Sequence, residues 1–339
     1  MILIDSLYIN NSGGKTLLDY LVQELEKTDL VIFYLFDARC NNDYKFISKE
    51  RKLFLKASIF NRYRFYKKNK KRFSKVFCFG NLPPLIRFKN AEVYTYFHQT
   101  LFLSTPSNSS FAFKITLKFK TLFLRLFKKN TNLWFVQSEY IKAALVRKYG
   151  ESFDKVEVLP FYPPIDTTSN NLYTYREKNT FIYVSSDNPH KNHVRLIEAF
   201  CLFYDKYQTG KLILTVHSKH SEIYNLIENK INNGYPINNL GFINREQLIE
   251  KYLSSEYLIF PSLTESFGLG IIEAIECGCK VIGTNLPYLY EVCKPSLTFN
   301  PFSVEGIQEA FYKAVNNEVF ETEQRIYDQV DKLIKHLRE

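Results

Sequence analysis

Two glutamates eight positions apart lie where a buried strand is expected to run into a helix. The segment reads Tyr257-Leu-Ile-Phe-Pro-Ser-Leu-Thr-Glu265-Ser-Phe-Gly268-Leu-Gly-Ile-Ile-Glu273-Ala-Ile-Glu-Cys-Gly278-Cys-Lys-Val-Ile-Gly283. Gly268 lets the backbone come close to a ligand, and the amides and dipole of a helix that begins there attract phosphate. Glu273, about one and a half turns into the helix, can accept paired hydrogen bonds from vicinal hydroxyls such as those of a ribose. Taken singly, a loop glutamate and a surface helical glutamate would be the ordinary interpretation.

A lysine at a second expected strand-to-helix turn suits the same kind of ligand. It lies in Tyr183-Val-Ser-Ser-Asp187-Asn-Pro-His190-Lys191-Asn192-His193, just before an apolar helical pattern. A lysine at the tip of such a turn can contact a diphosphate. The alternative is a lysine that is simply solvated at the surface.

A histidine and a glycine pair follow two further expected strands. His98 ends Val93-Tyr-Thr-Tyr-Phe-His98, and ligands of open parallel sheets bind outside the carboxyl ends of the strands. A purely structural histidine is the alternative. Asn11-Ser-Gly13-Gly14-Lys15-Thr16 contains Gly-Lys-Thr, but Ile9 stands where a P-loop needs its first glycine, which excludes that motif.

Alternating strand and helix patterns supply the scaffold for these residues. Strands are predicted at 2–5, 30–36, 76–80, 93–97, 133–136, 180–184, 211–216, 239–242, 257–260, 280–283 and 297–299. Helices are predicted at about 15–27, 138–149 (with Ser138 as N-cap), 193–207, 220–232, 245–253, 268–277, 303–315 and 318–338. The alternation indicates an α/β chain of two Rossmann-like, doubly wound domains that face a cleft.

The domain boundaries follow from a break in these patterns. Phe161-Tyr-Pro-Pro-Ile-Asp-Thr-Thr-Ser-Asn-Asn is predicted to be a linker, because adjacent prolines and small polar residues interrupt regular structure. The first domain would span 1–162 and the second 163–316. The remaining helix, 317–339, is left free to cross back to the first domain.

The block around the two glutamates resembles the retaining glycosyltransferases of family 4, also called glycosyl transferases group 1, which have the GT-B fold and a Glu-x7-Glu motif. Glu265 and Glu273 match the two acids, and Phe267, Gly268 and Leu269 match the turn between them. Phe260-Pro-Ser262 and Glu291 match flanking positions. The resemblance implies that Glu265 contacts the transferred sugar and that Glu273 holds the donor ribose. It implies that the amides after Glu265, those of Ser266, Phe267, Gly268 and Leu269, contact sugar or phosphate.

The resemblance assigns roles to the other three motifs as well. Lys191 matches a lysine that neutralises the leaving diphosphate, with Asn192 beside it as a further donor contact. Ser186 stands where the family usually has an arginine, so the charge would fall on Lys191, on His190 or Asn192, or on a basic residue from elsewhere. His98 matches a histidine that hydrogen-bonds the donor sugar, and Gly13 and Gly14 match a glycine pair near the donor phosphates and the acceptor. The catalytic set would then be Glu265, His98 and Lys191.

The cysteines and the ends of the chain bear on compartment and cofactors. Six cysteines without a preceding signal peptide favour free thiols in a reducing cytoplasm. Cys277-Gly-Cys279 lacks the second Cys or His pair of a zinc site, so two core cysteines are expected instead. No metal and no cofactor are predicted, because lysine and helix amides can carry the charge and the nucleotide sugar is a substrate.

The positive charge of the chain is concentrated in two segments of the first domain. The net charge is +10, but residues 49–75 and 111–129 together carry +17, which leaves −7 for the rest. A helix over 111–129 would carry Lys114, Lys118, Thr121, Arg125 and Lys128 along one stripe, with Phe111, Ile115, Phe119, Leu122, Phe123, Leu124 and Leu126 over the remainder. Such a helix can lie in an anionic lipid surface, or it can pack into the core with its lysines in water.

The resemblance, together with these patterns, implies a retaining, metal-independent glycosyltransferase that acts on a lipid-linked or growing polysaccharide acceptor. It would be cytoplasmic and peripheral on the inner face of the cell membrane, since no run of roughly 18 or more apolar residues is present. A nucleotide-sugar epimerase of similar fold is one alternative. A nucleic-acid-binding protein is the other, suggested by the aromatic and basic residues at 49–75, although no recognition motif accompanies them.

Overall fold

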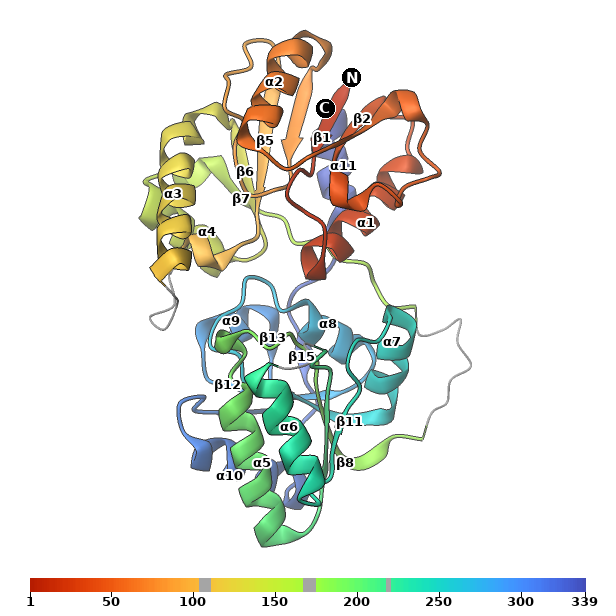
Figure 1. Ribbon diagram of the computed structural model, residues 1–339, viewed down its shortest axis with the longest axis vertical. Helices are drawn as coiled ribbons and strands as arrows, with labels where there is room; N and C mark the ends of the chain where they lie inside the picture. The colour runs from red at the N-terminus through yellow and green to blue at the C-terminus, as the bar shows by residue number, and fades with distance from the viewer. Residues whose placement is uncertain (104–110, 167–174, 218–220) are drawn as a thin grey trace. The chain divides into compact units, whose positions relative to one another are not determined.

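The computed structural model describes residues 1–103, 111–166, 175–217 and 221–339 (Figure 1). The chain forms two compact units, Met1–Pro163 with Tyr327–Glu339, and Pro164–Ile326. Each unit is built on parallel strands joined by helices, which confirms the predicted α/β class.

The first unit holds one parallel sheet with strand order β3-β2-β1-β4-β5-β6-β7. Its elements are β1 (Ile2–Asp5), α1 (Ser12–Glu26), β2 (Ile32–Asp37), β3 (Lys52–Leu55), α2 (Ile59–Asn69), β4 (Lys75–Cys78), β5 (Glu92–Phe97), α3 (Phe111–Phe127), β6 (Leu133–Val136), α4 (Glu139–Tyr149), β7 (Val156–Val158) and α11 (Val330–Arg338). The chain leaves β1 toward β2 and later returns to the other side of β1 at β4. The strand order therefore reverses between β1 and β4.

One face of this sheet is covered by α2, α3 and α4. The register aligns Leu3 with Val76, Val76 with Val93, and Thr95 with Trp134. Alternate residues of a strand point to the same side, so all of these positions share one face. Buried clusters on this face contain Phe65 and Tyr66 of α2, Leu117 and Leu124 of α3, and Ile141 and Leu145 of α4.

The opposite face is covered by α1 and α11. Tyr34 of β2 donates a hydrogen bond to Glu26 at the end of α1, over 2.7 Å. The rings of Tyr94 and Phe135 lie against His336 of α11. The last helix of the chain is thus part of the first unit.

The second unit holds a parallel sheet with strand order β10-β9-β8-β11-β12-β14 and a short antiparallel pair, β13 with β15. Its elements are β8 (Glu177–Tyr183), α5 (His193–Tyr207), β9 (Lys211–Leu214), α6 (Glu222–Asn232), β10 (Ile237–Asn239), α7 (Arg245–Ser254), β11 (Ser255–Phe260), α8 (Leu269–Glu276), β12 (Lys280–Thr284), α9 (Pro287–Val292), β13 (Cys293–Lys294), β14 (Leu297–Phe299), α10 (Val304–Asn316) and β15 (Glu323–Gln324). Here the order reverses between β8 and β11.

Local signals in the sequence account for several helix ends. The Ser138 side chain accepts a hydrogen bond from the amide of Ile141, as expected for the N-cap of α4. Gly150 ends α4 in the left-handed conformation, where a residue without Cβ is favoured. Asn244 and Gln247 form a reciprocal capping box at the start of α7.

Three expectations about the connections were wrong in part. The final helix begins at Val330 rather than near 318, because the preceding stretch pairs as β15 in the second unit before the first unit resumes at Tyr327. The first two linker residues, Phe161 and Tyr162, are buried in the first unit, while the linker residues after 166 lie outside the described residues. Helix α1 begins at Ser12, so the glycine pair lies within its first turn.

The cysteines and the helices agree with two simpler expectations. All six cysteines are buried free thiols, and burial raises the pKa of Cys277 and of Cys279 to about 12. This confirms that the pair belongs to the core. Within the described ranges, no helix has the length and apolar character needed to cross a membrane.

Candidate functional site

The second unit brings two predicted motifs together at the point where its strand order reverses. β8 and β11 are neighbours, with Phe181 beside Tyr257 and Ile182 beside Leu258. The loops that leave their carboxyl ends carry Lys191 and Glu265. Open parallel sheets bind ligands at such a switch point, because the two loops diverge there and leave room between them.

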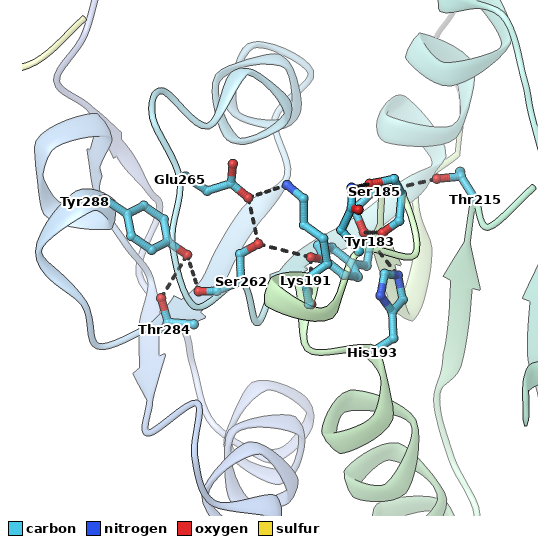
Figure 2. A network of polar contacts seen from close by, with 11 residues as sticks. Tyr183, Ser185, Lys191, His193, Thr215, Ser262, Glu265, Thr284 and Tyr288 are labelled. Carbon is cyan, nitrogen blue, oxygen red and sulfur yellow. Dashed lines mark hydrogen bonds and ion pairs between the residues drawn. The ribbon is translucent and has the colours of Figure 1, made fainter. Parts of the chain in front are cut away.

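Lys191 and Glu265 form an ion pair across these loops (Figure 2). Oε1 of Glu265 accepts from Lys191 Nζ and also from Ser262 Oγ, the latter over 2.6 Å. The two charged side chains are only 17% and 14% exposed, so the pair is poorly screened by water. Figure 2 shows the other carboxylate oxygen of Glu265 pointing away from both partners.

Backbone contacts hold the two loops in place around this pair. The amide of Leu263 donates to the carbonyl of His190 over 2.8 Å, which ties one loop directly to the other. Tyr183 donates to the carbonyl of Lys191 over 2.9 Å, and Tyr288 donates to the carbonyl of Ser262 over 2.6 Å. Burial raises the pKa of both tyrosines, so each keeps its proton and remains a donor.

A neutral histidine lies behind the Lys191 turn. His193 is buried at the start of α5, and its Nε2 lies 3.1 Å from Ser185 Oγ. Desolvation and the nearby Lys191 lower the pKa of His193 to about 4. Its Nδ1 is buried and has no hydrogen-bond partner among the described residues. His193 therefore adds no charge to the site near neutral pH.

Asn192 was predicted to contact the nucleotide-sugar donor, but its side chain is hydrogen-bonded to other residues of the protein. It has φ +62°, in the left-handed region, and is 5% exposed. Its side-chain amide donates to the carbonyls of Pro261 and Pro301, and its oxygen accepts from Arg195. These contacts fix the turn that presents Lys191, so its side chain acts here as a positioning group.

Gly268 starts the helix that follows Glu265. It has φ +74°, and a Cβ there would lie 2.8 Å from Cδ1 of Ile271. Both facts explain why glycine occupies this position. Phe267 beside it is buried, while Ser266 is partly exposed. The first backbone bond of α8 runs from the amide of Ile271 to the carbonyl of Gly268, so the amide of Leu269 precedes the regular ladder.

Glu273 is a buried carboxyl group paired with an arginine that the sequence patterns did not single out. It is 7% exposed, and its Oε1 lies 3.2 Å from Arg245 Nη1, at the start of α7. Burial raises the pKa of Glu273 to about 7, although Arg245 opposes this shift. The hydroxyl of Tyr252, also on α7, is buried without a hydrogen-bond partner among the described residues.

Two residues of this site were absent from the predicted set. The first is Ser262, which lay in a stretch that matched the family, so the sequence held a signal for it. The second is Arg245, a basic residue at the start of α7 that pairs with Glu273. Ser186 itself accepts a hydrogen bond from Asn188 over 2.7 Å. No local sequence pattern predicts the pairing of Arg245 with Glu273, because α7 and α8 come into contact only through tertiary packing.

In the first unit the structure brings together His98 and the glycine pair. His98 is stacked on Phe79, with 5.0 Å between ring centroids, and its Nε2 lies 2.9 Å from the Phe79 carbonyl. The Phe79 carbonyl can only accept, which favours a proton on Nε2, whereas the side-chain amide nitrogen of Asn81, a donor, lies 3.2 Å from the same atom. Burial lowers the pKa of His98 to about 4, so the ring is neutral. A Cβ on Gly14 would lie 3.4 Å from Cε1 of His98, whereas one on Gly13 would meet nothing within 4 Å.

A buried ion pair positions the loop beside His98. Arg62 of α2 is 2% exposed and donates to Asp5 over 2.7 Å. The same guanidinium donates to the carbonyls of Leu82 and Pro83, in the loop that follows β4. Asn81 in this loop accepts from the amide of His98 over 2.6 Å. The loops after β1, β4 and β5 are thus joined at the reversal point of the first sheet.

Metal ligands are not grouped in the described parts of the chain. No cluster there contains three or more His, Cys, Asp or Glu side chains placed to hold an ion. The prediction that no metal is needed stays a prediction, as does the prediction of no cofactor.

The geometry of the second unit agrees with a family match. Residues 165–332 match the model of the family described as glycosyl transferases group 1. This part of the chain belongs to that family. The group 1 domain thus contains both loops of the Lys191–Glu265 pair and both partners of the Glu273–Arg245 pair.

Curated relatives of the group 1 domain cover part of the chain. The serotype-specific mannosyltransferase WbdA of Escherichia coli is 27% identical over 166 residues, which is 46% of this chain and 20% of WbdA. The O-antigen chain mannosyltransferase B of Escherichia coli is 23% identical over 194 residues, 53% of this chain and 51% of that protein. The chain therefore spans about a fifth to a half of the length of these relatives.

A likeness to solved structures extends over both units. The sucrose-phosphate synthase of Thermosynechococcus elongatus superposes with a TM-score of 0.69 and covers 92% of this chain and 88% of its own. The identity is 16%, so this likeness concerns the fold alone. The group 1 domain and the first unit together have the GT-B fold, as predicted.

Proposed function

We propose that the chain is a retaining glycosyltransferase that moves a sugar from a nucleotide-sugar donor to a glycan acceptor. The observation that carries this proposal is the Lys191–Glu265 pair at the switch point of a group 1 domain, next to the helix that carries Glu273. A cation, a carboxylate and the start of a helix are the groups that a sugar diphosphate requires.

The positive groups of the site would stabilise the departing diphosphate. When the bond to the anomeric carbon breaks, negative charge grows on the leaving phosphate and the sugar becomes oxocarbenium-like. Lys191 and the amides at the start of α8 supply positive charge on one unit, although Ser186 replaces the usual arginine. We infer that these groups make a metal unnecessary, so a chelator should leave the rate unchanged.

Glu265 and Glu273 would take different parts of the donor. Glu265, with one oxygen directed away from Lys191, would accept hydrogen bonds from the hydroxyls of the transferred sugar. Glu273 would accept from the ribose hydroxyls, and Arg245 would hold its charge in place. The family resemblance points to retention through front-side attack, which a determination of the anomeric configuration of the product tests directly.

The first unit would contribute a neutral hydrogen-bonding group. In the tautomer that has its proton on Nε2, His98 would have a lone pair on Nδ1 that can accept from a sugar hydroxyl. The glycines at the start of α1 leave open backbone near that ring. The acceptor would be lipid-linked or a growing polysaccharide, and the names of the two relatives favour a mannosyl donor.

A binding screen followed by a transfer assay tests this proposal. Nucleoside diphosphates and their mannose and glucose derivatives are added to the protein, and the thermal unfolding midpoint is measured. A ligand at about one hundred times its dissociation constant stabilises a protein by about 2.7 kcal/mol. Donors that shift the midpoint are then incubated with oligosaccharide and lipid-linked acceptors, and the released diphosphate is measured.

Matched variants make the outcome specific to the site. Lys191→Ala and Glu265→Gln should lower the rate of transfer by about a hundredfold or more, as expected for loss of one group that stabilises developing charge. Lys178→Ala and Glu250→Gln remove exposed charges of the same unit and should leave it unchanged. If no nucleotide shifts the midpoint, or if all four variants behave alike, the assignment to a nucleotide-sugar transferase is wrong.

A further inference from the structure

Helix α3 packs against the first unit with only one of its two apolar faces. Leu117 and Leu124 are buried in a cluster with Trp134, Ile141 and Leu145. These two side chains lie seven positions apart, on one side of the helix. The basic stripe that includes Lys118 and Arg125 therefore does not lie opposite the buried side of the helix. A different set of side chains lies on the side of α3 that faces away from the core.

A second apolar stripe on α3 faces solvent. Ile115, Phe119, Leu122 and Leu126 are 38%, 68%, 51% and 66% exposed. Their spacing of four, three and four residues puts them on one line along the helix, opposite Leu117 and Leu124. We call these four residues the outer stripe. In Figure 1 α3 lies at the outer edge of the first unit, which agrees with the exposure of these four side chains.

Cations flank the outer stripe on one side. Lys118 and Arg125 are exposed, and at about 100° per residue they fall within a quarter turn of the stripe; Lys129, just after the end of α3, is exposed as well. Residues 111–129 contain no acidic side chain. The long aliphatic stems of the lysine and arginine side chains can lie along an apolar surface while their charges reach phosphate groups. An exposed apolar stripe whose charged neighbours are all positive is typical of helices that lie in a membrane interface.

A second basic helix covers the same face of the sheet. On α2 the side chains of Ile59 and Phe60 are 46% and 76% exposed, and Arg64, Lys67 and Lys68 are exposed beside them. Because α2 and α3 cover one face of the sheet, both present apolar and basic side chains away from that face. The residues outside 49–75 and 111–129 carry a net charge of −7, so the excess of positive charge comes from the two segments that contain α2 and α3.

We propose that the first unit docks on an anionic lipid bilayer through α3. The outer stripe enters the boundary between headgroups and acyl chains, and Lys118, Arg125 and Lys129 contact lipid phosphates. Binding to a nucleic acid would account for the cations, but it would not account for four exposed apolar side chains along one line of the helix. The inference complements the proposed function by bringing the enzyme to a lipid-linked acceptor, but it rests on α3 and not on the catalytic site.

Co-sedimentation with vesicles tests the proposal on the full chain. Vesicles of phosphatidylcholine with about one-third phosphatidylglycerol should retain the protein at low salt, and pure phosphatidylcholine should not. Phe119→Gln with Leu126→Gln should weaken binding at least tenfold, because each apolar side chain would otherwise be buried in the interface. Lys118→Gln with Arg125→Gln should weaken it about fivefold for each charge removed.

Two controls separate docking from unspecific effects. Phe320→Gln removes an aromatic side chain of the second unit that is 84% exposed, and it should bind vesicles like the unaltered protein. All six native cysteines are buried, so Leu122→Cys offers one accessible thiol for an environment-sensitive fluorophore. Its emission should shift to the blue with anionic vesicles if Leu122 enters the interface.

The results of the vesicle experiments test membrane docking independently of the transferase activity. Absence of binding to anionic vesicles, or unchanged binding after loss of Phe119 and Leu126, would overturn it. Competition by RNA that depends on Lys118 and Arg125 but not on the outer stripe would indicate a nucleic-acid surface instead. Stabilisation of each variant by nucleoside diphosphates reports on the second unit alone, so a failure of docking and a failure of the proposed transferase are distinguishable.

Discussion

Replacement of Glu273 by glutamine is expected to stabilise the protein above neutral pH. Burial raises the pKa of this carboxyl from 4.5 to about 7, despite the nearby Arg245. Glutamine keeps the shape of the side chain and removes the charge. A carboxyl group whose pKa is raised by folding stabilises the fold only while it is protonated, so its contribution is lost as the pH rises from 4.5 through 7.

The size of the effect follows from the shift. One pKa unit corresponds to 1.36 kcal/mol, so an upward shift from 4.5 to about 7 costs about 3 kcal/mol when Glu273 is fully ionised. Of this, about 2 kcal/mol falls between about pH 5.5 and about pH 8.5, because the unfolded chain is already mostly ionised at the lower pH. Glu273→Gln should gain that amount relative to the unaltered protein over this interval.

Urea unfolding at the two pH values measures the difference directly. Glu250→Gln is the matched control, since it removes an exposed carboxylate from α7 and should show no such change. If Glu273→Gln gains nothing between the two pH values, or is less stable at the higher one, then the carboxylate is stabilised by Arg245 more than burial penalises it. A carboxylate kept at a cost to folding would agree with a role in binding, and nucleotide-induced stabilisation should disappear in the same variant.

Three further predictions concern other residues of the two units. Asn192→Ala should lower the free energy of unfolding by about 1–3 kcal/mol in urea denaturation, because it leaves two buried carbonyl groups without their donor; unchanged stability would contradict a positioning role. Gly268→Ala should be more destabilising than Gly234→Ala, since both have positive φ but only Gly268 lacks space for a Cβ, and thermal unfolding of the pair decides this. His98, with its pKa lowered to about 4, should favour folding above pH 6.5 and lose that contribution as the pH falls through 4, so acid unfolding of His98→Gln should be less steep.

Several parts of the site could be predicted from the sequence because they depend on neighbouring residues. The turn at Gly268 needs a residue without Cβ, and the strand before it is a continuous apolar run. The order of strand, loop and helix can therefore be predicted from neighbouring residues. The same holds for Ser138, whose side chain caps the helix that starts one residue later. The family match adds that this order is shared with glycosyl transferases of group 1.

Other features depend on contacts between distant segments, which no local pattern encodes. Asn192 was predicted to meet a ligand, yet its amide is bound by carbonyls of two other loops. The last helix was predicted to be more than twice as long as it is, because a charged stretch can be helical or extended. In the structure Glu323 and Gln324 of this stretch pair with β13 instead.

The sequence by itself determined the alternation of strands and helices, the spacing of Glu265 and Glu273, and the concentration of positive charge in two segments. Periodicity and spacing are properties of neighbouring residues, so they survive without a tertiary structure. Only the folded chain decided that Arg245 lies beside Glu273 and that α3 turns a second apolar stripe to the solvent. Both depend on which helix face packs against the core, and that choice is made by shape and burial over the whole unit.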